Sequence, residues 1–199
     1  MPGPLPSPSA RVVLADHASP SLRETVKAIN KESQNIHAEM LLRTLGRVVG
    51  HYGSLTVGLE TLNAFDGCEV GILSGEAHFS DGSGLSREDL VTPHAVVKLL
   101  LHMSRSSSFS AFFDSLPVSG VDGTLATRLA GDRMRGKVHA KTGTVEHVNA
   151  LSGYMDLPSG KRVVFSIFGN NHPMKETAGA ATLDAVAIEI YKWFSGRDR

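Results

Sequence analysis

The C-terminal third of this 199-residue chain carries the pattern that most constrains its fold. Three runs of strand length and strand composition, 138–144, 150–156 and 162–169, follow one another with short connections. The tetrapeptide LPSG between the second and third runs is typical of a β-hairpin. Short connections join antiparallel strands, because a parallel pair needs a long crossover. The sequence therefore predicts an antiparallel meander in this region.

A long helix is expected after the meander, over residues 177–194, ending before Gly196. The residues of its apolar face are Leu183, Ala187, Ile190, Tyr191 and Phe194. Helical signals also fill the chain before the meander. Ser19 as a cap, Pro20 as the first helical residue and the capping-box pair Ser21 and Glu24 predict a helix over about 20–30.

Further helices are expected in the upstream part at 36–49, at 56–65, from Pro93 to 103, after Phe109 and near 125–129. The apolar run 11–15 predicts a short strand, and the Pro-rich residues 1–10 are expected to be disordered. Helices followed by a meander and a last helix form an α+β order.

Bulk properties exclude several functional classes. Twenty acidic and twenty basic residues cancel, and no block of like charge is present, so we expect no nucleic-acid partner. The single cysteine, Cys68, excludes an intrachain disulfide and a cysteine-based zinc cage. No apolar stretch has the length of a membrane span, and residues 1–20 contain no signal-peptide core.

Two short motifs carry the chemistry. Lys141, Thr142 and Gly143 lie in the predicted strand 138–144 and combine a cation, a hydroxyl and a glycine, a set suited to a carboxylate-bearing ligand. Ser33 and Asn35 form a Ser-x-Asn before a helix, where a hydroxyl can relay a proton and an amide can hold a carbonyl. The alternatives are a plain strand end and a helix cap.

A Ser-x-x-Lys would complete the three-part signature of serine enzymes that react with penicillin. The residues three positions before the eight lysines are Glu24, Ala28, Ala95, Met134, Val138, Pro158, His172 and Glu189. None is a serine. The attacking serine is therefore expected to lie outside this chain.

The segments SPSLRETVKAINKESQNIHAEMLLRTLG, DGSGLSRED, SGVDGTLATRLAG and KTGTVEHVNALSGYM extend the match over about 12–194. With them the chain resembles the C-terminal part of the D-alanyl-D-alanine carboxypeptidase/endopeptidase family, the class C low-molecular-mass penicillin-binding proteins. The resemblance implies a β-lactamase/transpeptidase-like α+β fold, with helices packed on an antiparallel sheet and the nucleophile helix missing. Residues 11–199 are then the C-terminal portion of a D,D-peptidase domain.

The resemblance also implies a function. The family hydrolyses D-Ala-D-Ala termini or D-Ala-diaminopimelate cross-bridges of peptidoglycan stem peptides through an acyl-enzyme that β-lactams mimic, without a cofactor or metal. Its members act in the periplasm or cell envelope. The isolated chain is expected to be inactive, and a noncatalytic peptidoglycan-binding remnant or module is the alternative. The oligomeric state is left open.

Carried over by motif, the expected catalytic residues are Ser33, Asn35 and Lys141. The expected substrate-binding residues are Thr142, Gly143 and Thr144, the N–H of Thr144 being half of the oxyanion hole. Residues 81–84, Asp-Gly-Ser-Gly, are expected to form a structural turn near the cleft.

Overall fold

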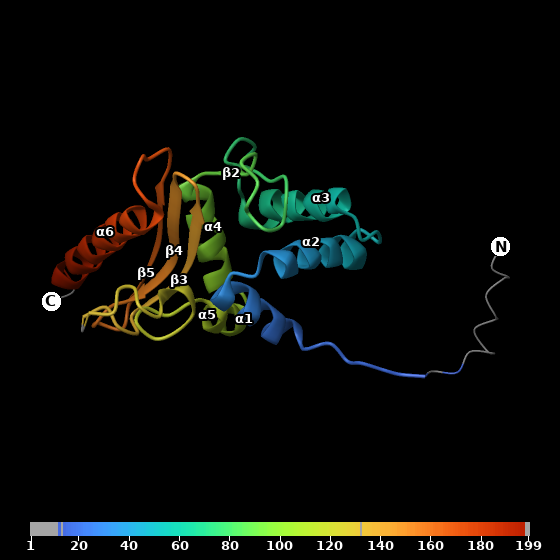
Figure 1. Cartoon of the computed structure of the whole chain (residues 1–199), viewed down its shortest axis with the longest axis horizontal. Helices are drawn as coiled ribbons and strands as arrows, with labels where there is room; N and C mark the ends of the chain where they lie inside the picture. Colours follow the sequence, from blue (N-terminus) through green and yellow to red (C-terminus); the bar gives the residue numbers. More distant parts are fainter. Residues whose placement is uncertain (1–11, 13, 132, 198–199) are drawn as a thin grey trace.

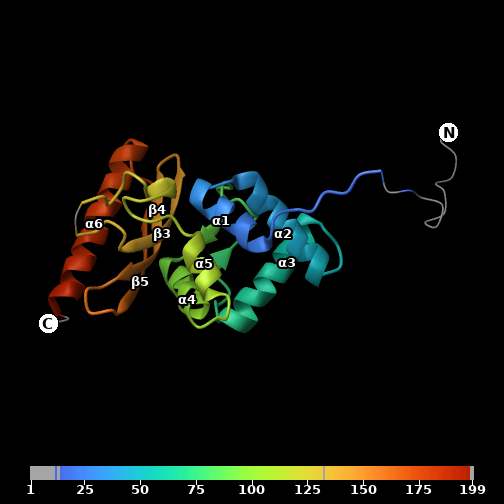
Figure 2. The ribbon, with the colours of Figure 1, turned by 90° about the horizontal axis from the view of Figure 1, so that it is seen from below.

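The computed structural model of the protein describes residues 12, 14–131 and 133–197 (Figure 1). A three-stranded sheet carries one long helix on one face, and the other helices lie beyond its opposite face. Figure 2, turned by 90°, shows the same division from below. The helices before the meander and the helix after it therefore sandwich the sheet.

The sheet is the predicted meander. Strands β3 (Val138–Val145), β4 (Val148–Asp156) and β5 (Arg162–Gly169) pair antiparallel in the order β3-β4-β5. Helix α6 (Glu176–Arg197) follows and crosses one face (Figure 1). The prediction of an α+β order with an antiparallel meander is confirmed.

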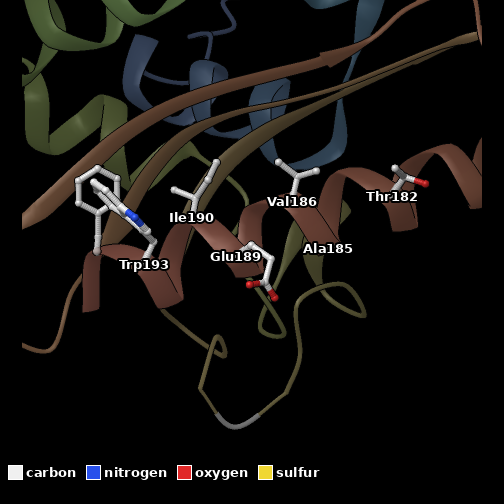
Figure 3. Close-up of a pocket in the computed structure, with 7 residues that line it drawn as sticks. Thr182, Ala185, Val186, Glu189, Ile190 and Trp193 are labelled. Carbon is white, nitrogen blue, oxygen red and sulfur yellow. The ribbon is translucent and has the colours of Figure 1, made fainter. Parts of the chain in front are cut away.

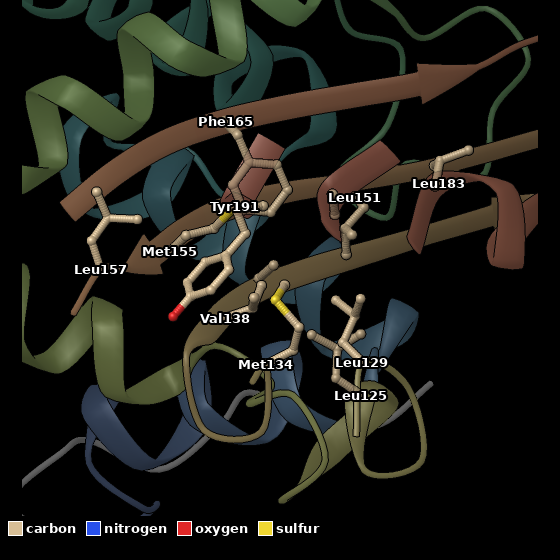
Figure 4. Close-up of a cluster of buried hydrophobic side chains, with 12 residues drawn as sticks. Leu125, Leu129, Met134, Val138, Leu151, Met155, Leu157, Phe165, Leu183 and Tyr191 are labelled. Atoms are coloured by element: carbon tan, nitrogen blue, oxygen red, sulfur yellow. The ribbon is translucent and has the colours of Figure 1, made fainter. Parts of the chain in front are cut away.

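The main core lies between the sheet and α6. Leu151 and Met155 on β4 point to the same face because strand side chains alternate, and they are fully buried. Leu183, Ala187 and Tyr191 of α6 meet them at the four-residue spacing of one helix face. Figure 4 shows this cluster, which Leu125, Leu129, Met134, Val138, Ala140, Leu157 and Phe165 complete.

The opposite face of the sheet packs on α4 (Pro93–Ser104) and α5 (Phe109–Ser115). Tyr154 is fully buried there, and its hydroxyl donates to the Leu100 carbonyl at 2.7 Å. Burial raises the pKa of Tyr154 to about 12, because the phenolate would lose its hydration. The hydroxyl therefore acts as a neutral donor that fixes α4 to β4.

The remaining helices are α1 (Leu22–Glu32), α2 (Asn35–Val49) and α3 (Leu55–Phe65). A Cβ on Gly58 of α3 would come within 2.5 Å of the Leu42 carbonyl oxygen of α2, so only glycine allows this close approach. Beyond a π-helical turn, Asp66–Val70, the two-residue strands β1 (Ala77–His78) and β2 (Leu90–Val91) pair antiparallel. A 3-10 turn, η3, covers Gly123–Leu125.

Several element ends differ from the prediction. Helix α1 begins after Pro20, because Ser21 is the N-cap and shares a full capping box with Glu24. The helix expected near 125–129 is only the turn η3, since Leu129 adopts φ of +50° and cannot continue a right-handed helix. Helix α6 continues through Gly196 to Arg197, whose guanidinium lies 3.7 Å from the Trp193 ring centroid.

The strand expected at the N-terminus, over residues 11–15, is not formed by the residues of it that the structure describes. Residues 1–10 lie outside the described residues, as do 11 and 13 of the expected strand 11–15. Val12 and 14–15 form no strand, and Val12 and Leu14 are 81% and 95% exposed. A segment without a partner strand gains no ladder hydrogen bonds, which accounts for the absence of the expected strand at 14–15. Within the described ranges, no helix combines the length and the apolar composition needed to cross a bilayer.

The Tyr154 contact gives a first prediction. Tyr154→Phe should lower the free energy of unfolding by about 1 kcal/mol, because it removes one buried hydrogen bond without removing the ring. Urea denaturation followed by circular dichroism measures this loss, with an unchanged m-value. Tyr52→Phe is the matched control, since Tyr52 is 70% exposed. Equal stability of the two variants would contradict the role of the hydroxyl.

A second prediction concerns acid stability. Glu76 accepts hydrogen bonds from Lys98 and from the Leu73 N–H, both at 2.7 Å, and lies 2.7 Å from His94 Nδ1. The Lys98 hydrogen bond is the largest of the causes that lower its pKa from 4.5 to about 2. The pKa of this carboxylate is depressed in the folded state, so it stabilises the fold above the unfolded pKa and ceases to do so as the pH falls toward 2.

Glu76→Gln should accordingly lower Tm at neutral pH, and the gap to the wild type should shrink as the pH falls from 4.5 toward about 2. Thermal melts across that range test it. Glu60→Gln serves as the control, because Glu60 is exposed and has no ion pair among the described residues. A gap independent of pH would show that the carboxylate charge is not what stabilises this turn.

Candidate active site

A cleft of about 1310 Å³ lies between the helical part and the end of the sheet. Helices α1 and α2 form one wall, and the segments 75–84 and 89–92 form another. Most of the wall is aliphatic, with Leu22, Val26, Ile29, Leu41, Leu42 and Leu45. Among the described residues that line the cleft, Lys141 is the only lysine or arginine. A mostly apolar cleft with few polar groups is the usual form of a ligand site.

Ser33 stands where α1 ends. Its N–H bonds to the Ile29 carbonyl, and its backbone is left-handed, with φ of 57° and ψ of 52°. This conformation costs a non-glycine residue roughly 1–2 kcal/mol. Ser33 is thus a helix cap, but at the C-terminus of α1 and not at the start of α2, where Gln34 is the N-cap. The strain is stored next to the cleft, as often happens at functional sites.

The last turn of α1 is fixed by a buried lysine that the motifs did not indicate. Lys31 is 8% exposed, and its Nζ donates to the Leu116 carbonyl at 2.6 Å and to both Asp122 carboxylate oxygens at 2.6 and 2.7 Å. Asp122 also accepts the N–H of Val118 at 2.9 Å. This ion pair, whose Asp122 side chain is 43% exposed, ties α1 to the segment beside β3, and Ser33 is only two residues away.

Lys141 lies on β3, lines the cleft and reaches Ser33 at the end of α1. Its Nζ donates to Ser33 Oγ at 2.8 Å and to the Thr142 carbonyl at 2.8 Å. Burial lowers the pKa of Lys141 from its ordinary value, because the ammonium group loses hydration. Since the Ser33 oxygen accepts from Lys141, the hydroxyl proton of Ser33 is left for an acceptor in the cleft. The structure thus brings together two expected catalytic residues 108 positions apart.

The other expected residues differ in their surroundings. Asn35 is the first residue of α2; it is exposed, and its amide makes no hydrogen bond to another described residue. The hydroxyl of Thr142 donates to Thr124 Oγ1 in η3 at 2.8 Å. Gly143 and Thr144 line the cleft. Thr124 is therefore a further polar neighbour of the site that the sequence motifs did not reveal.

The free edge of β3 borders the cleft. The N–H groups of Val138 and Ala140 bond outward, to the segment 117–119. Alternate residues of a strand present their N–H groups to the same edge. The N–H groups of Thr142 and Thr144 therefore point the same way, and no described strand pairs with β3 along that stretch. An extended ligand can add to this edge as a further strand.

Residues 81–84 form a turn at the cleft, as expected. The Asp81 carboxylate accepts the N–H groups of Gly84 at 2.6 Å and Ser86 at 2.9 Å. The N–H of Gly82 donates to Glu39 Oε1 at 2.8 Å, which fastens the turn to α2. The polar groups of this segment are used to shape the wall.

Other possible sites are weaker. In the described part of the chain, no three His, Cys, Asp or Glu side chains are grouped so that they could hold a metal ion. A second hollow, of about 510 Å³, lies along α6 and is lined by Val186, Ile190 and Trp193 (Figure 3). Its acidic residue, Glu189, pairs with Lys192 at 2.6 Å. This hollow lies on the far side of the sheet from α2 and contains no converging polar groups.

Comparison with known proteins identifies relatives of the chain. The sequence profile of the family described as D-Ala-D-Ala carboxypeptidase 3 (S13) matches residues 5–189. The D-alanyl-D-alanine carboxypeptidase of Actinomadura sp. (strain R39) is 40% identical in an alignment of 187 residues that covers 91% of this chain and 34% of that protein. The chain spans about a third of the length of the curated relatives it matches.

Solved structures show the same fold. Penicillin binding protein 4 of Haemophilus influenzae, complexed with a β-lactam, superposes with a TM-score of 0.76 at 27% identity, over 84% of this chain and 41% of that one. The TLA-1 extended-spectrum β-lactamase has a TM-score of 0.69 at 18% identity, over 88% of this chain and 64% of that one. The predicted β-lactamase/transpeptidase-like α+β fold is confirmed.

The left-handed backbone of Ser33 gives a third prediction. Ser33→Gly should be more stable than Ser33→Ala by about 1 kcal/mol, because glycine adopts this conformation without a Cβ clash. Both variants lose the hydroxyl that accepts from Lys141, so their difference isolates the backbone. Chemical denaturation of the two proteins side by side measures it. Equal stabilities would mean that position 33 relaxes out of the left-handed region in solution.

Proposed function

Because the chain belongs to the D-Ala-D-Ala carboxypeptidase 3 (S13) family, we propose that it is the C-terminal portion of a serine-type D-alanyl-D-alanine carboxypeptidase/endopeptidase. The substrate is a peptidoglycan stem peptide, and the reaction passes through an acyl-enzyme. The observation that carries this proposal is the 2.8 Å hydrogen bond to Ser33 Oγ from Lys141 Nζ, the cation that lines a largely apolar cleft.

This hydrogen bond suits a proton relay to the leaving group. When an acyl-enzyme forms, the C–N bond breaks and the departing nitrogen needs a proton. Ser33 can give its hydroxyl proton to that nitrogen, because the serine oxygen already accepts from Lys141. The ammonium group of Lys141 stabilises the negative charge that develops on the oxygen. The exposed Asn35 amide, two residues on, is then a contact for a substrate carbonyl.

The free edge of β3 supports the binding half of the proposal. A stem peptide lying antiparallel to β3 can accept hydrogen bonds from the outward-pointing backbone N–H groups of Thr142 and Thr144. The Thr144 N–H serves as one donor of the oxyanion hole, and Gly143 leaves room for the substrate backbone. The hydroxyl groups of Thr144 and of Thr124, which accepts from the Thr142 hydroxyl, are donors for the substrate carboxylate. β-Lactams are proposed as ligands, since the related penicillin binding protein 4 was solved with one.

The nucleophile in this proposal is carried by a segment outside the 199 residues. No serine stands three positions before a lysine in this chain, and its curated relatives are about three times as long. The aliphatic lining of α1 and α2 supports the presence of a covering element, with Leu22 64% exposed. An apolar helix bearing Ser-x-x-Lys would bury this surface and place its serine near Lys141. The isolated chain is then inactive.

The place of action follows from the substrate. Peptidoglycan lies in the cell envelope, so we propose that the assembled protein works in the periplasm or envelope. The second candidate is a noncatalytic peptidoglycan-binding module. This candidate is supported by the hydrogen bond between Lys141 and Ser33 in a chain that has no Ser-x-x-Lys, because such a cleft can bind a peptide without hydrolysing it.

Covalent labelling separates the two candidates. A fluorescent penicillin is incubated with the 199-residue chain and with a version extended on the N-terminal side by its own coding sequence, and intact mass is measured. We expect a single adduct on the extended protein only. In that protein, Ser33→Ala and Lys141→Met should each slow acylation by a factor on the order of 10² or more, as for loss of a general acid–base group.

The controls decide between the remaining outcomes. The extended protein with alanine in place of its Ser-x-x-Lys serine must stay unlabelled, and Tyr52→Phe must label like the wild type, since Tyr52 is exposed and outside the cleft lining. An adduct on the 199-residue chain itself would mean that another serine attacks. No adduct on either protein, with saturable binding of peptidoglycan fragments, would establish the binding module instead.

A further inference from the structure

A hydrogen-bonded chain of three side chains lies behind the end of β3. His172 Nε2 lies 2.9 Å from Asn149 Oδ1, and Asn149 Nδ2 donates to Thr144 Oγ1 at 3.3 Å. Asn149 is on β4 directly opposite Thr144 on β3, and His172 is on the loop between β5 and α6. Thr144 itself is exposed and lines the cleft. This series of hydrogen bonds thus runs from the buried side of the sheet to the ligand site.

The position of the histidine proton follows from an unpartnered atom. His172 Nδ1 is buried and has no hydrogen-bond partner in the part of the chain that the structure describes. A buried N–H without an acceptor is rarer and more costly than a bare lone pair, so the proton of the neutral ring belongs on Nε2. Nε2 then donates to Asn149 Oδ1, and the Asn149 amide must turn its NH₂ group toward Thr144. The Thr144 oxygen becomes an acceptor, and its own proton is left for the cleft.

The surroundings hold the hydrogen-bonded side chains of His172, Asn149 and Thr144 rigidly. Asn149 is 2% exposed, and Gly179 in the first turns of α6 lies so close that a Cβ there would collide with Asn149 Oδ1. The loop that bears His172 is fastened to the β3–β4 turn by two contacts. The His172 N–H donates to the His147 carbonyl at 3.2 Å, and His147 Nδ1 lies 3.0 Å from the His172 carbonyl. Such packing fixes side-chain direction.

We propose that His172 and Asn149 are positioning residues that set the Thr144 hydroxyl as a hydrogen-bond donor toward the ligand carboxylate. The inference rests on the proposed function, because it assigns the groups that prepare one donor of that site. Without the relay, the Thr144 hydroxyl can rotate and present a lone pair to an anion. Neither residue touches the ligand, so their effect passes entirely through Thr144.

The first test uses the 199-residue chain alone and needs no activity. ¹⁵N NMR of the labelled protein distinguishes a protonated from a bare ring nitrogen, and His172 is assigned by its loss in His172→Gln. The expected result is a proton on Nε2 and a bare Nδ1 at neutral pH. A proton on Nδ1 would reverse the direction of the relay and overturn the proposal.

The second test measures penicillin acylation of the extended protein. His172→Leu should lower the second-order acylation constant by about tenfold, chiefly through weaker binding, since one directed hydrogen bond is lost. His172→Gln should restore most of the rate, because its amide can donate from nearly the same place as Nε2. Asn149→Asp should be worse than His172→Leu, because a carboxylate takes the Thr144 proton for itself and repels an anionic ligand.

The Thr144→Val background separates positioning from general damage. There, His172→Leu should have no further effect on acylation, because the group through which it acts is gone. An equal loss in both backgrounds, or an equal loss in the Gln and Leu variants, would mean a structural role and overturn the inference. If the extended wild-type protein is not acylated at all, the proposed function fails, and the NMR result alone decides the relay.

Discussion

The buried ammonium group of Lys31 is the interaction on which the arrangement of the two halves depends. It joins the last turn of α1 to the segment 116–122, which in turn pairs with the first half of β3. A buried cation is tolerated only when it is fully paired, and Lys31 has both an Asp122 carboxylate and the Leu116 carbonyl. The distance between Ser33 and Lys141 is therefore set by a contact that lies outside the cleft.

Around that anchor, several residues depart from the ordinary preferences of their type. Ser33 is left-handed, Lys141 is an ammonium group in a mostly apolar cleft, and β3 leaves part of its edge unpaired. Each of these costs stability in a protein without a ligand. Together they concentrate a donor, a cation and an open backbone edge in one place, which is the condition for binding a peptide and polarising its carbonyl.

Local sequence signals predicted the parts of the fold that depend on local forces. Helix starts are determined locally by the capping pair at Ser21 and by Thr92 before Pro93, and the strands of the meander by their composition. The structure confirms these predictions. The expected helix near 125–129 failed because the backbone of Leu129 is set by packing. Lys31 with Asp122, and Asn149 with His172, had no signal, since their partners are 91 and 23 positions away.

The same separation has a kinetic consequence. The meander and α6 are joined by short connections, so their contacts close small loops and are expected early in folding. The contact of Ser33 with Lys141 closes a loop of 108 residues and can form only after α1 has docked. The cleft is therefore expected to acquire its order after the sheet. A full-length chain refolding from denaturant would have a complete sheet before it had a site.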